Sequence, residues 1–313
     1  MGKIRGAATP PPSNRILPIL PMTSELIFTG ERFHPDQAGE MWNEHWHRYH
    51  FVMPIVSGKK VLDVACGEGY GSALMARVAA SVTGVDVAPK AIAHAEVAYG
   101  DRPGLKFINA SCDALPFDDA QFDVVVSFET IEHIKTQDKF LSEIRRVLKP
   151  DGVLVMSSPN KTEYSDVRGY TNEFHVKELY ADELANLVSG HFAHTRWWSQ
   201  RNGFYSLIAP AAGNDSSMSV EVVVVSKAAP QDEYPALPAL YFIVTAANDN
   251  AALAKLTIGT SAFTDAEEFA MNDYRKIYRE LVSLSATHHE LRSKYEQLLA
   301  ERNQLLVDRA NGR

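Results

Sequence analysis

Two carboxylates and an imidazole lie close together in the sequence, at Glu129, Glu132 and His133. Their spacing of three and four residues places them on one face if this turn is helical. Such a set suits a divalent cation, and an imidazole can also act as a general base near neutral pH. Three interpretations stay open: a metal site, a metal-free role for His133 as base or substrate-orienting group, or a structural role for the segment.

A glycine-rich segment precedes this group. Residues 61–72 read Val-Leu-Asp-Val-Ala-Cys-Gly-Glu-Gly-Tyr-Gly-Ser, an apolar run that breaks into a turn with alternating glycines. A buried strand, a glycine turn and a helix cradle adenine nucleotides in doubly wound α/β folds. The spacing Gly67-x-Gly69-x-Gly71 is not G-x-G-x-x-G, and Asp63 suits a ligand with an ammonium group. Both features disfavour a nicotinamide dehydrogenase.

Two further acids follow at the expected places. Asp86 ends a second apolar run about twenty residues beyond the glycine turn, where an acid accepts hydrogen bonds from ribose hydroxyls. Asp113 stands in Ser-Cys-Asp-Ala-Leu-Pro-Phe and can accept from an adenine amino group. A fourth run ends at Phe128, and Leu-Lys-Pro-Asp-Gly at 148–152 is a helix stop before a fifth strand.

These five segments, in this order between Lys59 and Asn160, resemble the motifs of the Rossmann-like (class I) S-adenosylmethionine-dependent methyltransferases. The resemblance implies an enzyme of the EC 2.1.1 type with S-adenosylmethionine as its cofactor. It implies cofactor binding by Asp63, Ala65, Gly67, Gly69, Asp86, Val87, Asp113, Ala114 and Phe128, with Arg48 and Tyr49 added from the segment before the first strand.

The Glu-x-x-Glu-His segment, with His175 beyond a Ser-Pro-Asn turn, is similar to the metal site of the small-RNA 2′-O-methyltransferases. The ubiquinone-biosynthesis O-methyltransferases share the Glu-x-x-Glu-His pattern. The resemblance implies Glu129, Glu132, His133 and His175 as ligands of Mg²⁺ or Mn²⁺, and Glu132 and His133 as catalytic residues. A metal would lower the pKa of a weakly acidic sugar hydroxyl.

Two other segments resemble bacterial methyltransferases of polysaccharide and O-antigen biosynthesis: 28–49, with Thr-Gly-Glu-Arg-Phe and His-Arg-Tyr, and 172–178, Asn-Glu-Phe-His-Val-Lys-Glu. The resemblance implies a sugar hydroxyl of a surface polysaccharide or its precursor as the acceptor, with a glycosyltransferase of the same pathway as a candidate partner. One alternative is a small-molecule, quinone-type O-methyltransferase. Another is a coiled-coil scaffold with a vestigial methyltransferase fold.

The pattern of apolar runs predicts an α/β fold, a Rossmann-like seven-stranded and mostly parallel sheet with an antiparallel closing pair. Strands are expected at 61–64, 82–86, 105–109, 122–127 and 153–158, and helices at 71–80, 89–98, 137–147 and 181–189. The runs 192–199 and 220–226 would form the closing pair, and 239–244 an added edge strand.

Five regions are expected along the chain. They are a disordered Pro-rich tail at 1–21, a helical lid at 22–57, the methyltransferase domain at 58–245, a linker at 246–264 and a coiled coil at 265–310. The coiled coil rests on apolar residues that alternate every three and four positions, with Leu at most d positions. It predicts self-association as a dimer or trimer. The alternative is one amphipathic helix packed on the domain.

Composition limits the partners and the location. The chain has 313 residues and a net charge of −8, which disfavours nucleic-acid binding through electrostatics. It contains no apolar stretch of membrane-spanning length. Two cysteines, Cys66 and Cys112, suit a reducing compartment. We therefore expect a cytoplasmic protein without a transmembrane segment, associated with a membrane only through its partners.

Overall fold

The computed structural model describes residues 39–203, 224–226, 229–234, 238–256, 258–264 and 268–310. The predicted disordered tail at 1–21 lies outside these residues, as do Thr29–Phe33 and most of the run 220–226.

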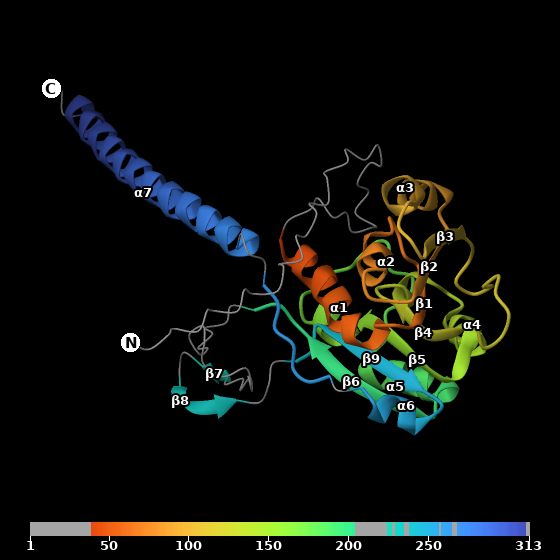
Figure 1. The fold of residues 1–313 in the computed structure, drawn as a ribbon. Helices are drawn as coiled ribbons and strands as arrows, with labels where there is room; N and C mark the ends of the chain where they lie inside the picture. Colours follow the sequence, from red (N-terminus) through yellow and green to blue (C-terminus); the bar gives the residue numbers. More distant parts are fainter. Residues whose placement is uncertain are drawn as a thin grey trace, which may run out of the picture.

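A seven-stranded sheet forms the centre of the protein (Figure 1), in the order β3-β2-β1-β4-β5-β9-β6. β9 runs antiparallel to both of its neighbours, and the pairs among the first five strands are parallel. The predicted fold class is therefore confirmed. The strands are β1 (Lys60–Val64), β2 (Ser81–Asp86), β3 (Leu105–Asn109), β4 (Phe122–Ser127), β5 (Leu148–Pro159), β6 (His194–Gln200) and β9 (Tyr241–Ala247).

The closing pair differs from the prediction. The described end of the run 220–226, β7 (Val224–Ser226), pairs with β8 (Ala229–Tyr234) in a separate two-stranded sheet. The run expected at the edge, 239–244, instead forms β9 between β5 and β6. Six of its seven residues are buried, so its apolar sequence fits an internal strand with both faces covered.

Helices cover both faces of the sheet in three layers. One apolar core lies beneath α1 (Glu40–Val56), α2 (Tyr70–Met75), α3 (Pro89–Tyr99) and α6 (Asn250–Ala254). The other lies beneath α4 (Gln137–Val147) and α5 (Ala181–His191). Successive residues of a strand point to opposite faces, so Val61 joins the first core and Leu62 the second.

The end of the domain also differs from the expected boundary. β9 continues to Ala247, and α6 buries Ala252 and Leu253 in the first core, inside the range expected to be a linker. α2 is shorter than expected, ending at Met75. Among the described residues, none of the helices combines the length and apolarity that crossing a bilayer requires.

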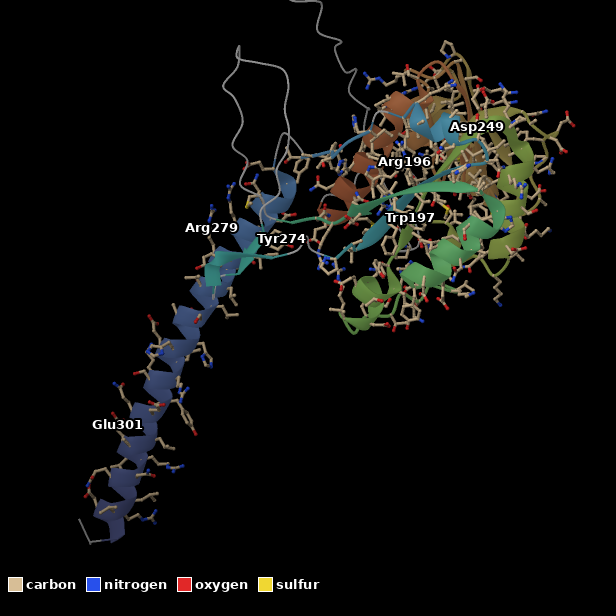
Figure 2. The ribbon with its side chains drawn as sticks, turned by 90° about the horizontal axis from the view of Figure 1, so that it is seen from below. Arg196, Trp197, Asp249, Tyr274, Arg279 and Glu301 are labelled. Carbon is tan, nitrogen blue, oxygen red and sulfur yellow. The ribbon has the colours of Figure 1, made fainter. Side chains whose placement is uncertain are left out.

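α7 (Phe269–Ala310) is a single helix of 42 residues that leads away from the domain in both views (Figures 1 and 2). At 1.5 Å per residue it is about 60 Å long. Its helical state agrees with the heptad pattern, and its self-association stays a prediction.

Candidate functional site

The candidate site lies at the point in the sheet where the strand order reverses, beside β1. β1 pairs with β2 on one side and β4 on the other, and in open α/β sheets ligands bind beyond the carboxyl ends of the strands at this switch point. Two non-glycine residues just beyond these ends, Ala65 (φ 60°) and Glu129 (φ 49°), have left-handed backbone conformations. Such strain concentrates at functional sites.

The glycine loop is held in place by Asp86. Gly67 N–H donates to Asp86 Oδ2 at 3.0 Å, and Ala88 N–H donates to Oδ1 at 2.8 Å. Gly69 has φ 84°, and a Cβ there would lie 2.7 Å from the side chains of Ala95 and Phe107. Asp86 thus fixes the loop, and its contact with the cofactor ribose stays a prediction.

Asp63 is the most deeply buried acid of this loop region, at 1% exposure. Ser72 Oγ donates to its Oδ2 at 2.6 Å, and its Oδ1 has no hydrogen-bond partner. Burial raises the pKa of Asp63 to about 7, although Ser72 opposes the shift. An unpaired carboxylate oxygen in this position fits the ammonium group of S-adenosylmethionine, whose positive charge would offset the cost of burial.

α1 covers the glycine loop with Tyr49. A Cβ on Gly71 would lie 1.9 Å from Tyr49 Cζ, so only glycine leaves room for the ring. The ring also meets the edges of Tyr70 and Phe128, at centroid distances of 5.3 and 5.2 Å. The helix expected as a lid therefore packs on the predicted cofactor loop.

Asp113 lies in the loop after β3. Ser111 Oγ and Thr136 Oγ1 donate to its two oxygens at 2.6 and 2.8 Å. These hydroxyls hold the pKa of Asp113 below its ordinary value. The predicted neighbours Val87 and Ala114 lie in the loops after β2 and β3, at the same edge of the sheet. The acid is thus fixed and ionised, as an acceptor for an amino group requires.

Arg48 directly precedes Tyr49 on α1, and its side chain is 1% exposed. Its Nε donates to Gln200 Oε1 at 2.7 Å, one terminal nitrogen lies 3.6 Å from Glu129 Oε1, and the guanidinium lies 4.4 Å from the Tyr241 ring centroid. Neither terminal nitrogen has a hydrogen-bond partner. Burial raises the pKa of nearby Glu44 to about 7, against the opposing effect of Arg48. Arg48 therefore contacts the ends of β4, β6 and β9, and its contact with the cofactor stays a prediction.

A possible metal cluster lies beyond β4. Glu132, His133 and His175 each offer one ligand atom, and these atoms lie within 4.8 Å of one another. Glu132 is 1% exposed, and neither carboxylate oxygen has a hydrogen-bond partner. Burial, reinforced by Glu129, raises the pKa of Glu132 well above its ordinary value. A buried, unpaired carboxylate beside two imidazoles is a donor set that a divalent cation accepts.

Hydrogen bonds fix how the two imidazoles point. His133 Nδ1 lies 3.0 Å from the Phe174 carbonyl oxygen, so Nδ1 carries the hydrogen and Nε2 keeps its lone pair. His175 Nδ1 lies 2.5 Å from Glu178 Oε1, and its Nε2 accepts from Asn172 Nδ2 at 3.0 Å. Phe174 N–H donates to Asn172 Oδ1, which sets the orientation of that amide. His133 therefore directs Nε2 toward the cluster, whereas His175 Nε2 would have to give up its hydrogen bond from Asn172 to bind a cation.

Glu129 does not join this cluster. Ser157 Oγ donates to Glu129 Oε1 at 2.6 Å, Glu129 N–H donates back to Ser157 Oγ at 3.0 Å, and Arg48 lies nearby. The expected common face required a helical turn, but the turn is a short 3₁₀ segment, Ile131–His133, with Glu129 in the left-handed region before it. Three of the four predicted ligand side chains therefore lie together, and Glu129 lies outside the group in this conformation.

Residues 62–156 match a family model described as a methyltransferase domain. This segment contains the glycine loop, all three acids that were expected at the cofactor, and β4 with Glu129–His133. This segment is therefore similar to a methyltransferase domain, in agreement with the resemblance to the class I S-adenosylmethionine-dependent enzymes.

Two similar proteins are named as methyltransferases, and one similar solved structure is given for comparison. A probable S-adenosylmethionine-dependent methyltransferase of Mycobacterium tuberculosis is 41% identical over 169 residues, which cover 52% of this chain and 60% of the relative. The mitochondrial ubiquinone biosynthesis O-methyltransferase of Schizosaccharomyces pombe is 36% identical over 150 residues, which cover 42% of this chain and 54% of the relative. A crystal structure of a Pyrococcus horikoshii protein superposes with a TM-score of 0.47 at 23% identity, and the match covers 56% of this chain and 95% of that protein. The chain spans about 60% of the length of the mycobacterial relative.

Sequence reasoning missed the residues that support the methyltransferase site. Glu178 was quoted only as part of a motif, yet it binds His175 through one oxygen and accepts from Ser165 Oγ through the other at 2.5 Å. Gln200 and Ser157 carried no signal, because their partners Arg48 and Glu129 lie 152 and 28 residues away. The signal for Glu178 was its spacing of three residues from His175.

A wall of aromatic rings stands beside the cluster. Tyr164, in the π-helical turn Thr162–Asp166, stacks on His175 at a centroid distance of 5.3 Å. Its ring also lies 5.7 Å from Tyr241 and 5.9 Å from Tyr170, which is half exposed. π-helical turns occur frequently at functional sites. The wall can contact a ring-shaped acceptor bound next to the imidazoles.

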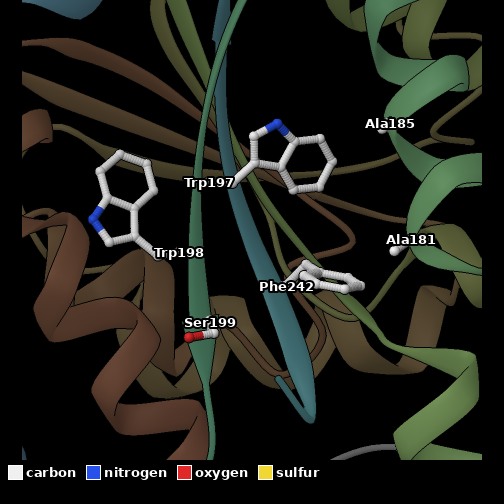
Figure 3. Close-up of a pocket in the computed structure, with 6 residues that line it drawn as sticks. All are labelled: Ala181, Ala185, Trp197, Trp198, Ser199 and Phe242. Carbon is white, nitrogen blue, oxygen red and sulfur yellow. The ribbon is translucent and has the colours of Figure 1, made fainter. Parts of the chain in front are cut away.

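A hollow of about 490 Å³ opens between α5 and the edge strand β6 of the methyltransferase domain (Figure 3). Trp197 and Phe242 face α5 there, with Ala181 and Ala185 opposite. None of its lining residues has an ionisable side chain, so the hollow has no group for acid–base catalysis.

Proposed function

We propose that this protein transfers a methyl group from S-adenosylmethionine to a hydroxyl oxygen. The observation that carries the proposal is the unpaired Oδ1 of buried Asp63 at the switch point, with an imidazole cluster beyond the neighbouring strand β4. When bound, S-adenosylmethionine supplies a methyl group activated by a positively charged sulfur. Asp63 would bind its ammonium group, Asp86 its ribose and Asp113 its adenine.

The chain's own residues then align the acceptor and remove its proton. Transfer would join the acceptor oxygen to the methyl carbon and release S-adenosylhomocysteine, and the hydroxyl proton would go to a base on the protein. His133 directs Nδ1 at the Phe174 carbonyl oxygen, so Nε2 is the ring nitrogen that would accept the proton. The Tyr49 ring of α1 lies against Gly71 of the loop and would shield it from water.

Our proposal includes a divalent cation, Mg²⁺ or Mn²⁺, held by Glu132, His133 and His175. The two orphaned oxygens of Glu132 support it, because a buried carboxylate without a partner is costly unless a cation neutralises it. A bound cation would lower the pKa of the acceptor hydroxyl. Full turnover in EDTA would exclude the metal and leave His133 as a metal-free base.

For the acceptor we propose a sugar hydroxyl of a bacterial surface polysaccharide or its precursor, with a glycosyltransferase of the same pathway as a partner. The aromatic wall at Tyr164 and Tyr170 supports a ring-shaped acceptor. A small quinone-type phenol is the second candidate, because the Schizosaccharomyces pombe relative is named for ubiquinone biosynthesis.

Transfer of a tritiated methyl group separates these acceptors. The purified protein is incubated with lipid-linked sugars, with polysaccharide fragments and with hydroxylated quinone precursors, each with and without EDTA. Label on the sugars, located by linkage analysis, supports the proposal, whereas label only on quinone precursors supports the second candidate. Asp63→Asn is the control for cofactor dependence. No affinity of the wild-type protein for S-adenosylmethionine would overturn the function and leave a scaffold with a vestigial fold.

A further inference from the structure

α7 exposes a long apolar stripe to solvent. From Ile277 onward every d position of its heptads is Ile or Leu, and each of these side chains is at least 60% exposed: Ile277, Leu284, Leu291, Leu298 and Leu305. From the first to the last of them the stripe extends about 40 Å. An exposed apolar surface of this size marks an interaction site, and a lone helix gains little stability without covering it.

We propose that the stripe is covered by α7 of a second copy of this chain, running antiparallel to the first. A heptad stripe packs against a second stripe of the same spacing, and an identical helix has this spacing over its full length. In the register that overlaps the helices most fully, His288 lies opposite Leu291 of the second copy. Leu284 then lies opposite Tyr295, and Ile277 opposite Arg302.

The a positions favour this direction. They are occupied by Tyr274, Leu281, His288, Tyr295 and Arg302. In a parallel, in-register pair each a residue faces its own copy, so two Arg302 guanidinium groups and two His288 rings would meet in the core. In an antiparallel pair each a residue faces a d residue, so every polar or aromatic side chain packs against Ile or Leu.

The e positions give an independent argument. Along the helix they read Met271, Tyr278, Ser285, Arg292, Leu299 and Leu306, apolar at both ends and polar in the middle. In an antiparallel pair e positions face e positions, which places Tyr278 against Leu299 and Ser285 against Arg292. In a parallel pair e faces g, and Leu299 would meet Lys294.

The g positions, on the other side of the helix pair, bring like charges together. There g faces g, and Glu280 lies opposite Glu301 at two symmetry-related places. Both acids are exposed, so the repulsion is small and is screened by salt. Added salt should therefore tighten the pair. The antiparallel arrangement places the two methyltransferase domains at opposite ends of the pair, about 60 Å apart along α7.

Distances between spin labels on the full chain test the direction. Cys112→Ser leaves only Cys66, which is 2% exposed and whose thiol pKa is raised by burial, so it resists labelling. Single cysteines are then introduced as Gln304→Cys or Ser283→Cys at exposed c positions. The antiparallel register expects axial separations of about 45 Å for the first and about 20 Å for the second. Two short, equal distances mean a parallel assembly, and no dipolar signal means no assembly; either result overturns the proposal.

A charge substitution gives a second test. Leu299→Glu places a carboxylate against Tyr278 in the antiparallel pair and against Lys294 in a parallel one. The proposal expects the dissociation constant of the dimer, measured by analytical ultracentrifugation, to rise about tenfold or more, since two symmetric contacts are lost. Val307→Glu, at an f position that is 52% exposed, is the matched control and should leave it unchanged. An unchanged or tighter dimer of the Leu299 variant would contradict the antiparallel direction.

Discussion

Asp63→Asn should make the apo-protein more stable at alkaline pH while abolishing cofactor binding. Burial raises the pKa of this carboxyl from 3.8 to about 7 in the folded protein. Between these values the folded state holds a proton that the unfolded state has released, so the free energy of unfolding falls as pH rises through this window. A shift of about 3 units at 1.36 kcal/mol each amounts to roughly 4 kcal/mol. The neutral amide escapes this cost and still accepts from Ser72.

The assay is urea unfolding of both proteins at pH 5 and pH 8. We expect the variant to gain up to about 4 kcal/mol over wild type at pH 8 and much less at pH 5. Calorimetric titration should show the opposite effect on function. Wild-type affinity for S-adenosylmethionine should rise from pH 6 to pH 8 as Asp63 ionises, and the variant should lose most of this affinity.

Asp123→Asn, near the start of β4, is the matched control. Partial burial works against it, but the Lys149 ammonium and the Lys60 amide hold the pKa of that carboxyl below its ordinary value. Its removal should therefore lower stability at pH 8. The reasoning about Asp63 is refuted if Asp63→Asn is no more stable than wild type at pH 8, or if it binds the cofactor with wild-type affinity.

Three further substitutions test other contacts. Gly71→Ala should lower the free energy of unfolding by about 1–3 kcal/mol, because its Cβ would lie 1.9 Å from the Tyr49 ring. A double-mutant cycle with Tyr49→Ala checks the cause. If Tyr49→Ala does not reduce the loss, the contact with the ring is not responsible. Arg48→Met should cost about 3–5 kcal/mol in urea unfolding at pH 8, because neighbouring buried carboxylates lose their cation. The loss should shrink at pH 5 as they protonate, and a pH-independent loss would argue for packing instead. Glu178→Gln should weaken Mn²⁺ binding about 10- to 100-fold in calorimetry by releasing His175, with cofactor affinity unchanged as the control; unaltered Mn²⁺ affinity would remove Glu178 from this role.

Much of the fold could be predicted from local sequence. Strands 105–109 and 122–127 and helix 137–147 have the bounds that their apolar patterns indicated. These segments carry their own signals, since side-chain periodicity and helix stops depend on neighbouring residues. The closing strand could not be chosen in this way. The runs at 220–226 and 239–244 look alike in isolation, and only packing beside β5 distinguishes them.

The same division holds for the site. The sequence by itself determined where the residues of the predicted cofactor half lie: a glycine loop that ends a strand and acids after successive parallel strands must gather at one edge of the sheet. Tertiary structure decided the arrangement of the proposed catalytic half. The left-handed backbone at Glu129 turns that carboxylate toward Ser157 and Arg48, while Glu132 is left buried and unpaired beside His175. These partners come from distant parts of the chain, and their desolvation and pairing depend on contacts that no local pattern encodes.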